Sequence, residues 1–495
     1  MDQTRNFGFE HKSGILMPVS SLAGPYGIGT FGRPCRRFID FLAKAKQTCW
    51  QVLPLNPTAY GDSPYQSPAS FAGNLYFIDV EALAEQGLLT KEELASCRHP
   101  LGRIDYGWLF NTRADVLRRA YARFRPNASY YYFLRTNADW LEDYALFMAL
   151  KVKHGYRPWS EWPHEERTYS SAVLAKADHR REMGFWRFVQ YLFHIQWRDV
   201  RRYARKKKIK IIGDMPIYVA YDSVEVWSHP ELFLLDGDLK PTVVAGCPPD
   251  GFSPDGQLWG NPIYHWERMK QNGFDWWVAR IRRSLALYDI LRIDHFRGFA
   301  GYYVIPFGDS TARGGHWVSG VGKELFARIK EALPNAKIIA EDLGFITPDV
   351  RELLDFTGFP GMKILQFAFY DENAEYLPRC YPHGNCVVYT GSHDADCTAT
   401  WCEQLSGDTK ARFERECPRQ KGMSAVWSLI DLAMGSKANL AVIPLQDYLE
   451  LPNERARMNT PSTAEGNWTW RACYRSTTKA LAERIAALTK KNGRH

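Results

Sequence analysis

The sequence predicts an α/β protein built on a parallel barrel. Short strand-like runs alternate with helical patterns over most of the 495 residues, as in repeated βα units. In addition, four apolar runs end on acidic chemistry, at Asp214, Asp294, Glu341 and Asp394. Strands of a parallel barrel have this pattern when their carboxyl ends meet at a reaction centre, because a carboxylate is tolerated at the open mouth but not in the packed interior.

The expected strands follow the chain in a regular order. A helical pattern such as 35–44 separates the first two, and a long helix before residue 209 leads into the acid-ended ones. This rhythm predicts a single barrel domain over residues 1–495. The expected strands are 13–20, 50–55, 210–214, 289–294, 337–341, 387–394 and 439–444.

Two segments interrupt the barrel pattern. From residue 58 to residue 182 the alternation gives way to Pro-rich loops and helix-like stretches such as 139–150, which predicts a helical insertion subdomain. Residues 244–262 are rich in Gly, Pro and Asp and include Trp259. Because long loops at the carboxyl face of a barrel often cover or contact a ligand, we expect an active-site lid loop there.

Composition argues against several classes of partner. The net charge of +8 is thinly spread, and its densest run, 198–210, is typical of the solvated basic end of a helix, so no nucleic-acid partner is expected. No stretch approaches the length of a membrane span, and the ten cysteines lack zinc-ligand spacing. We therefore expect a cytoplasmic protein with reduced thiols and no membrane partner. The 14% aromatic content weakly favours a sugar binder.

One glycine motif has the form of a dinucleotide fingerprint. Gly27-Ile-Gly29-Thr-Phe-Gly32 matches G-x-G-x-x-G and precedes a helix. The preceding strand, however, ends near Val19, and the following strand does not end on an acidic residue. We therefore expect no dinucleotide cofactor.

Arg292 and Asp294 form the first pair suited to catalysis. Residues two apart on a strand share a face, so the guanidinium lies beside the carboxylate. A neighbouring cation keeps a carboxylate ionised near neutral pH, as a nucleophile requires. A structural Arg–Asp pair at a strand end explains the pattern equally well.

Glu341 and Asp342 form the second candidate. Adjacent strand residues point to opposite sides, so one can enter an active centre while the other turns away, and the pattern does not choose between them. A general acid needs a raised pKa, which a second carboxylate about 5 Å away supplies by like-charge repulsion. Two solvated acids at a strand end are the alternative.

The third candidate is the run His393-Asp394-Ala-Asp396. Its side chains can form hydrogen bonds with neutral sugar hydroxyls. They are also possible metal ligands, but no His-x-x-x-His occurs in the chain, and Glu161 and His164 lie far away in the predicted insertion. We therefore expect no metal site.

Six motifs in one order carry a family resemblance. They are 214–223, 257–262, 292–298, 340–344, 361–367 and 390–394, and the similarity extends from Ser13 to Pro461. Together they resemble the 4-α-glucanotransferases, also called amylomaltases or disproportionating enzymes, of glycoside hydrolase family 77 in the α-amylase clan. The resemblance implies a (β/α)8 TIM barrel with helical insertion subdomains and no cofactor.

The resemblance also implies separate roles for the acids. Asp294 matches the nucleophile, Glu341 rather than Asp342 matches the general acid/base, and Asp394 matches a third carboxylate that grips sugar hydroxyls. The implied partners are α-1,4-glucans such as maltooligosaccharides, amylose and starch, and the implied reaction is retaining transfer to the 4-hydroxyl of an acceptor. The implied substrate-binding residues are Asp214, Arg292, His295, His393, Tyr60, Ser63, Tyr65 and Trp259.

The chain departs from the family pattern at a few positions. Ala395 and Cys397 stand where the family usually has Asn and Thr, Ser392 where Thr is common, and Gly251 where an aromatic residue is usual. These departures leave acceptor preference open. The alternatives are an α-1,4-glucan hydrolase using the same three carboxylates and a non-catalytic glucan-binding barrel. The sequence does not predict an oligomeric state.

Overall fold

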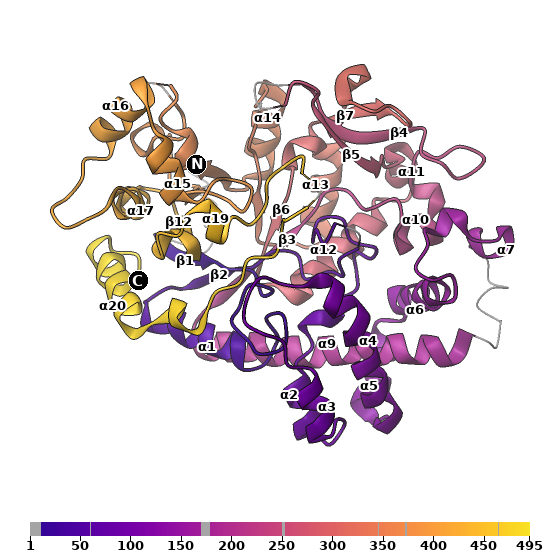
Figure 1. The fold of residues 1–495 in the computed structure, drawn as a ribbon. Coiled ribbons are helices and arrows are strands. Elements are labelled where there is room, and N and C mark those ends of the chain that lie inside the picture. The colour runs from indigo at the N-terminus through magenta and orange to yellow at the C-terminus, as the bar shows by residue number, and fades with distance from the viewer. Residues whose placement is uncertain are drawn as a thin grey trace.

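The computed structural model describes residues 11–59, 61–169, 179–249, 253–344, 346–371, 374–463 and 465–495. Within them, eight parallel strands form one sheet at the centre of the molecule (Figure 1). Following the chain from β1 to β12, each strand lies beside the next, and β12 pairs with β1. The strands are β1 (Lys12–Leu16), β2 (Cys49–Gln51), β3 (Lys210–Met215), β6 (Ile290–Ile293), β9 (Ile338–Ala340), β10 (Gly361–Ile364), β11 (Cys386–Tyr389) and β12 (Leu440–Pro444).

Contacts between β9 and β10 close this sheet into a barrel. The Ala340 amide donates to the Pro360 carbonyl at 3.0 Å, and the Met362 amide donates to Asp342 Oδ1 at 2.6 Å. Asp342 can approach β10 because Gly361 lacks a side chain: a Cβ there would lie 2.3 Å from the carboxylate. The predicted barrel is therefore confirmed, and Asp342 lies at its seam.

The sequence prediction missed one barrel strand and a second sheet. Strand β10 has only four residues and does not end on an acidic residue, so its segment was recognised only as a family motif. Residues 244–262, expected to be one loop, instead form most of two antiparallel strands and the connection between them; their Gly and Pro content hid the strand pattern. The second sheet has the order β5-β4-β7-β8, with β4 (Val243–Cys247), β5 (Gln257–Pro262), β7 (Gly301–Pro306) and β8 (His316–Ser319).

Helices that follow the barrel strands form an outer layer (Figure 1). The first and last of them, α1 and α20, pack against each other, so segments from the two ends of the chain lie side by side. These helices are α1 (Arg33–Lys44), α9 (Arg180–Lys206), α12 (Asp275–Leu287), α13 (Gly322–Ala332), α14 (Pro348–Thr357), α15 (Thr398–Gln404), α16 (Gly407–Glu416), α17 (Ala425–Gly435) and α20 (Lys479–Lys491).

A group of helices lies between β2 and β3, inside the range 58–182. Its helix α6 packs against α9, which runs below the barrel and α6 in Figure 1, while α2, α3 and α5 lie below α9 in that view. A separate subdomain over 58–182 stays a prediction. The group contains η1 (Leu75–Phe77), α2 (Val80–Glu85), α3 (Lys91–Ser96), α4 (Tyr106–Arg123), α5 (Ala128–Thr136), α6 (Ala138–Lys153), η2 (Trp159–Glu161) and α7 (His164–Arg167).

Short helices complete the loops around the barrel. They are α10 (Val224–Ser228), η4 (Pro230–Leu232), α11 (Trp266–Gln271), η5 (Phe296–Phe299), η6 (Ala312–Gly314), η7 (Leu365–Phe367), η8 (Pro378–Cys380), α18 (Leu445–Tyr448), α19 (Asn453–Ala456) and η9 (Tyr474–Thr477).

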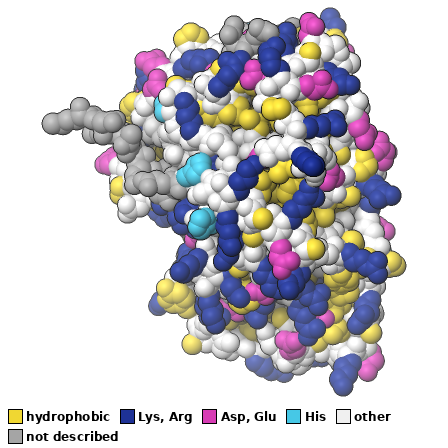
Figure 2. All heavy atoms as spheres, turned by 90° about the vertical axis from the view of Figure 1, so that its left-hand side faces the viewer, with side chains coloured by type: hydrophobic (Ala, Val, Ile, Leu, Met, Phe, Trp, Pro, Cys, Tyr) yellow, Lys and Arg dark blue, Asp and Glu magenta, His cyan; other side chains and the backbone are white. Residues whose placement is uncertain are grey.

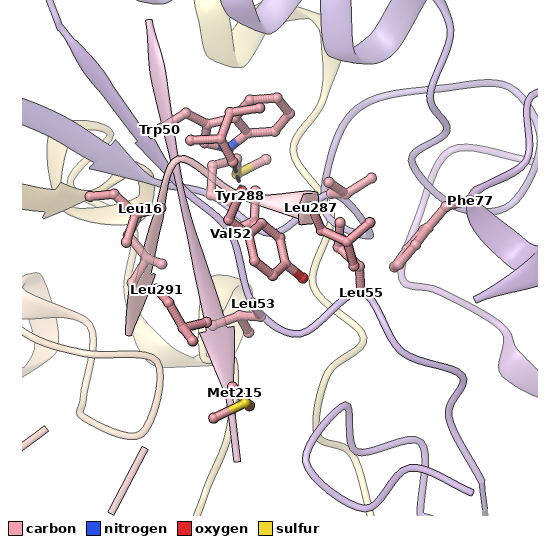
Figure 3. Packing of buried hydrophobic residues seen from close by; sticks show 14 of the residues in the cluster. Leu16, Trp50, Val52, Leu53, Leu55, Phe77, Met215, Leu287, Tyr288 and Leu291 are labelled. Carbon is pink, nitrogen blue, oxygen red and sulfur yellow. Dashed lines mark hydrogen bonds between the residues drawn. The ribbon is translucent and has the colours of Figure 1, made fainter. Parts of the chain in front are cut away.

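The core beside β2 and β3 shows how the barrel is packed (Figure 3). Trp50 is fully buried, and its indole N–H donates to the Met17 carbonyl at 2.7 Å, which satisfies its one polar atom. The ring of Tyr288 packs so closely on β3 that a Cβ at Gly213 would lie 2.0 Å from it. Such tight packing fixes the strands, and with them the residues at their carboxyl ends.

The basic residues are dispersed over the surface visible in Figure 2 rather than gathered in one patch. On the face in Figure 2, Lys and Arg side chains are interspersed with hydrophobic and acidic ones. Within the basic run, Arg201 and Arg205 contact Asp289 at 3.1 and 3.0 Å, so part of the charge is neutralised. Among the helices described, none combines the length and the apolar character needed to cross a bilayer.

Candidate active site

A cleft of about 780 Å³ opens at the carboxyl ends of the barrel strands. Its floor carries Asp294, His295, His393 and Asp394. One wall is the edge strand β5 with its preceding turn, and another is the segment 459–468 near the end of the chain. The cleft therefore brings together residues from the barrel, the second sheet and a distant segment.

Arg292 is a buried cation between two carboxylates. The ladder between β3 and β6 places Asp214 directly beside Arg292. Arg292 Nη1 lies 2.7 Å from both oxygens of Asp214 and 3.0 Å from Asp294 Oδ1, while its side chain is only 3% exposed. The structure thus brings together three residues that the sequence analysis selected, and gives Arg292 two acidic partners.

Asp294 and Glu341 follow neighbouring strands. Ile293 at the end of β6 pairs with Ala340 at the end of β9, so Asp294 and Glu341 lie at the same level of the barrel. Asp294 lines the cleft, and Glu341 beside it is buried. Burial raises the pKa of Glu341, and the nearby charge of Asp294 raises it further. Burial also raises the pKa of Asp294, but Arg292 opposes this shift. The carboxyl group without a cation in contact, Glu341, therefore holds the proton more firmly.

Two backbone amides orient the Glu341 carboxyl group. The His295 amide donates to Oε2 at 2.6 Å and the Leu343 amide to Oε1 at 2.7 Å. His295 reaches this position in a left-handed backbone conformation with φ of 49°, which is uncommon for a residue with a side chain. Asp342 turns away to the barrel seam, whereas Glu341 is held beside His295, which lines the cleft.

His295 and Trp259 form one side of the cleft. Their rings meet edge to face, with centroids 4.8 Å apart and an interplanar angle of 90°. Burial, reinforced by the positive charge of Arg297, lowers the pKa of His295 to about 3. The imidazole is therefore neutral at physiological pH, and it presents one donor and one acceptor.

Asp394 lies on the opposite side of the floor and is 44% exposed. Its Oδ2 lies 3.2 Å from His393 Nε2, and its Oδ1 accepts from Asn459 Nδ2 at 2.6 Å. Burial of its surroundings opposes ionisation, but His393 and the Asn459 hydrogen bond together lower the pKa of Asp394 to about 2. Asp394 is therefore ionised across the physiological range.

Tyr65 connects the two sides. Its hydroxyl donates to Asp214 Oδ2 at 2.9 Å, and its ring stacks on His393 with centroids 5.2 Å apart. One face of a ring expected to be an aromatic platform is therefore covered by His393. Ser63 Oγ accepts from the Tyr65 amide at 3.2 Å, and both residues line the cleft. Tyr60 lies outside the described residues.

The sequence analysis missed the contribution of the segment 459–468. Asn459 contacts Asp394, and Trp468 lies 5.7 Å from the Tyr65 ring and 6.0 Å from the His393 ring. This segment follows no acid-ended strand, so the strand pattern could not select it. The available signal was the run Arg457-Met-Asn459, which lies within the region of family resemblance but was given no role.

Asp396 was a possible metal ligand, and Gly251 was one of the departures from the family pattern. Within the described part of the chain, no group of three His, Cys, Asp or Glu side chains is arranged to hold a metal ion. Asp396 instead contacts Arg457 and accepts from Asn453 Nδ2 at 2.7 Å. Gly251 lies outside the described residues.

Known 4-alpha-glucanotransferases are similar to this protein over nearly the whole chain. Residues 17–476 match the family model described as 4-alpha-glucanotransferase. The 4-alpha-glucanotransferase of Clostridium butyricum is 46% identical over 490 residues, which cover 97% of this chain and all of the relative. That of Thermus thermophilus is 47% identical over 485 residues, with coverage of 92% and 94%.

A solved structure of an amylomaltase has the same fold as this protein. The amylomaltase from Streptococcus agalactiae in complex with acarbose superposes with a TM-score of 0.94 at 40% identity, covering 98% of this chain and 100% of that one. The family resemblance inferred from the six motifs is therefore confirmed. The chain belongs to the 4-alpha-glucanotransferase family.

Proposed function

We propose that this protein is a retaining 4-α-glucanotransferase. It transfers α-1,4-glucan segments from a maltooligosaccharide, amylose or starch donor to the 4-hydroxyl of an acceptor glucan or glucose. The observation that carries the proposal is the pair Asp294 and Glu341 at neighbouring strand ends, with Arg292 3.0 Å from Asp294 and two amides on Glu341. Membership in the family supports the same reaction.

In the first half-reaction Asp294 is the nucleophile and Glu341 the general acid. An Asp294 oxygen bonds to the anomeric carbon of the donor while the bond from that carbon to the bridging oxygen breaks. Glu341 gives its proton to the departing oxygen, which leaves as the 4-hydroxyl of the released segment. The raised pKa of Glu341 supports this role, because the proton must be present before the bond breaks.

In the second half-reaction the proton returns by the same route. Glu341, now a carboxylate, accepts the proton from the 4-hydroxyl of an incoming glucan, and that oxygen bonds to the anomeric carbon. The ester bond to Asp294 breaks and its electrons return to the carboxylate. Two inversions at the same carbon retain the α configuration, and both acids regain their starting states.

The remaining residues bind and orient the donor. We assign Asp394 and His393 to hydroxyls of the reacting sugar, because Asp394 is ionised and open to the cleft. Asp214 acts through Arg292, which it holds in place. The other proposed substrate-binding residues are Arg292, His295, Tyr60, Ser63, Tyr65 and Trp259. The proposed lid over them is the segment 244–262, of which residues 250–252 lie outside the described part of the chain.

Transfer requires that a sugar reach the intermediate before water does. A cleft of about 780 Å³ has room for several glucosyl units, so an acceptor can be held next to the intermediate. The transferase names of relatives near 45% identity favour this outcome over the hydrolase alternative.

All described cysteines are free, which supports a reducing compartment such as the cytoplasm.

Incubation with maltotriose tests the proposal. A transferase produces free glucose together with a ladder of longer and shorter maltooligosaccharides, while the number of reducing ends stays constant. A hydrolase instead increases the number of reducing ends. A glucan-binding protein without activity leaves maltotriose unchanged, and either of these results contradicts the proposal.

A further inference from the structure

A single side chain joins two segments of the active site that are far apart in sequence. The first segment is the loop 392–397 after β11, which carries Asp394. The second is 453–459, which begins with α19 and ends at Asn459. Arg457 belongs to the second segment, and its side chain, which is 21% exposed, reaches the first.

The guanidinium of Arg457 contacts both segments with three different nitrogens. Nη1 forms an ion pair with the Asp396 carboxylate, and Nη2 donates to the Asp394 carbonyl at 3.1 Å. Nε donates to the Asn459 carbonyl at 2.9 Å. The planar fork of an arginine can satisfy three acceptors in one plane, whereas the lysine ammonium is a compact point charge.

Arg457 contacts the same residues that determine the orientation of the Asp394 side chain. Asn459 Nδ2 donates to Asp394 Oδ1 at 2.6 Å, and the Asn459 amide donates to the His393 carbonyl at 3.1 Å. Arg457 thus fixes the backbone on both sides of the Asp394–Asn459 hydrogen bond. It does not line the cleft itself, unlike Asn459 and Asp394.

Asp396 is in turn held in place for this contact. Asn453 Nδ2 donates to its Oδ1 at 2.7 Å, and the Asn453 side-chain carbonyl accepts from the Cys397 amide at 2.8 Å. The Gln366 side-chain amide donates to the Asp396 carbonyl at 2.9 Å. These hydrogen bonds fix the position of Asp396, and Asp396 fixes the Arg457 guanidinium. A change at Arg457 is therefore expected to alter the position of Asp394 rather than that of Asp396.

We propose that Arg457 is a positioning residue for glucan transfer, which acts by holding Asp394 and Asn459 in register with the reacting sugar. The inference rests on the proposed function of Asp394. A misplacement of about 1 Å in such a group costs up to about 100-fold in rate. Because Arg457 does not contact the substrate, its loss lowers kcat and leaves KM for maltotriose within about threefold.

The variants are chosen to separate positioning from general destabilisation. Arg457→Met removes the fork but keeps much of the apolar stem, and we expect kcat to fall about 30- to 100-fold. Arg457→Lys keeps the charge for Asp396 but not the fork, so it restores only part of the rate. Asp396→Asn loosens the anchor and gives an intermediate loss. Arg455→Ala is the matched control, because Arg455 is exposed in the same short segment.

A double-mutant cycle with Asp394→Asn gives the decisive measurement, with initial rates taken at high enzyme concentration. If Arg457 acts through Asp394, Arg457→Met costs less than about threefold once Asp394 is already replaced. Circular dichroism and thermal melts verify that each variant is folded. Should Arg457→Met fail to fold, Arg457→Lys and Asp396→Asn take its place in the same cycle.

The outcomes distinguish this inference from the function beneath it. Full activity of Asp394→Asn overturns the proposed function of that carboxylate. An inactive Asp394→Asn together with a fully active Arg457→Met overturns the positioning role alone. Equal losses from Arg457→Met in both backgrounds, or an equal loss from Arg455→Ala, also overturn it, because a merely structural effect would be independent of Asp394.

Discussion

The two sides of the cleft are built in different ways. Asp294 and Glu341 follow adjacent barrel strands. The β6–β9 ladder sets their positions, and the backbone amides of His295 and Leu343, which directly follow the same two strands, bind the Glu341 carboxyl group. Asp394 follows β11, but its carboxylate is set by Asn459, which is 65 residues further along the chain. The first side is therefore fixed by barrel geometry, and the second by contacts between distant segments.

Replacing the nucleophile gives the largest expected effect on the barrel-fixed side. Asp294→Asn keeps the shape of the side chain but removes the attacking charge, so we expect the transfer rate from maltotriose to fall about 10⁴-fold or more with folding preserved. Product analysis measures the transfer rate, and circular dichroism verifies that the variant is folded. Activity within about tenfold of the unchanged protein would show that another group attacks the sugar.

The strand-end pattern explains why this side could be predicted from the sequence. Asp294 and Glu341 each follow a continuous apolar run, so position along a strand was enough to bring them together. Periodicity also showed that Arg292 shares a face with Asp294. It could not choose between Glu341 and Asp342, because that choice depends on β10, where the absence of a side chain at Gly361 gives Asp342 its place.

The other side could be predicted only in part. His393 and Asp394 were found because they follow a strand, whereas Asn459 and Arg457 follow a short helix whose neighbours are set by the fold of the whole chain. The second sheet was missed for a related reason. The apolar alternation of β4 and β5 is short and interrupted by glycine, so tertiary pairing rather than local pattern makes them strands.

The dependence of activity on pH separates the two sides next. Transfer needs Asp294 ionised and Glu341 protonated, so kcat/KM falls below the apparent pKa of the first and above that of the second. Because burial and the charge of Asp294 raise the pKa of Glu341, the alkaline limb lies well above the ordinary carboxyl value of 4.5. Beyond that limb kcat/KM falls about tenfold for each pH unit.

Asp394 contributes no limb to this profile, because its pKa of about 2 keeps it ionised throughout. A pH profile of kcat/KM with maltotriose, from about pH 4 to about pH 10, measures both limbs. A rate that stays constant to the alkaline end of this range would contradict the assignment of Glu341 as general acid. The Arg455→Ala control should reproduce the unchanged profile.

Asn459→Ala perturbs the side that depends on distant contacts. It removes the 2.6 Å hydrogen bond to Asp394, so the carboxylate loses one of its two side-chain partners and its orientation. We expect kcat to fall about tenfold, since His393 still holds the other oxygen. Initial rates over a range of maltotriose concentrations give kcat and KM separately. An unchanged kcat would mean that His393 alone is sufficient.

Restoring the family residue beside Asp394 gives the smallest expected effect. Ala395 stands where the family usually has Asn, and the sequence alone left open how far the missing amide loosens the loop. The loop is held instead through its neighbours: the Asp394 amide donates to Ser392 Oγ at 3.2 Å, and Arg457 pairs with Asp396. Ala395→Asn should therefore change kcat by less than about threefold.

The same substitution becomes informative in the Arg457→Met background. With the guanidinium absent, the loop 392–397 loses the ion pair at Asp396 and the hydrogen bond to the Asp394 carbonyl. An amide added at position 395 then has a larger loss of backbone order to restore. If Ala395→Asn raises kcat more in this background than in the unchanged protein, the two residues serve one purpose, and the arginine fork compensates for the missing amide. If its effect is equal in both backgrounds, the loop is held independently of residue 395, and the position of Asp394 depends on Asn459 and His393 alone.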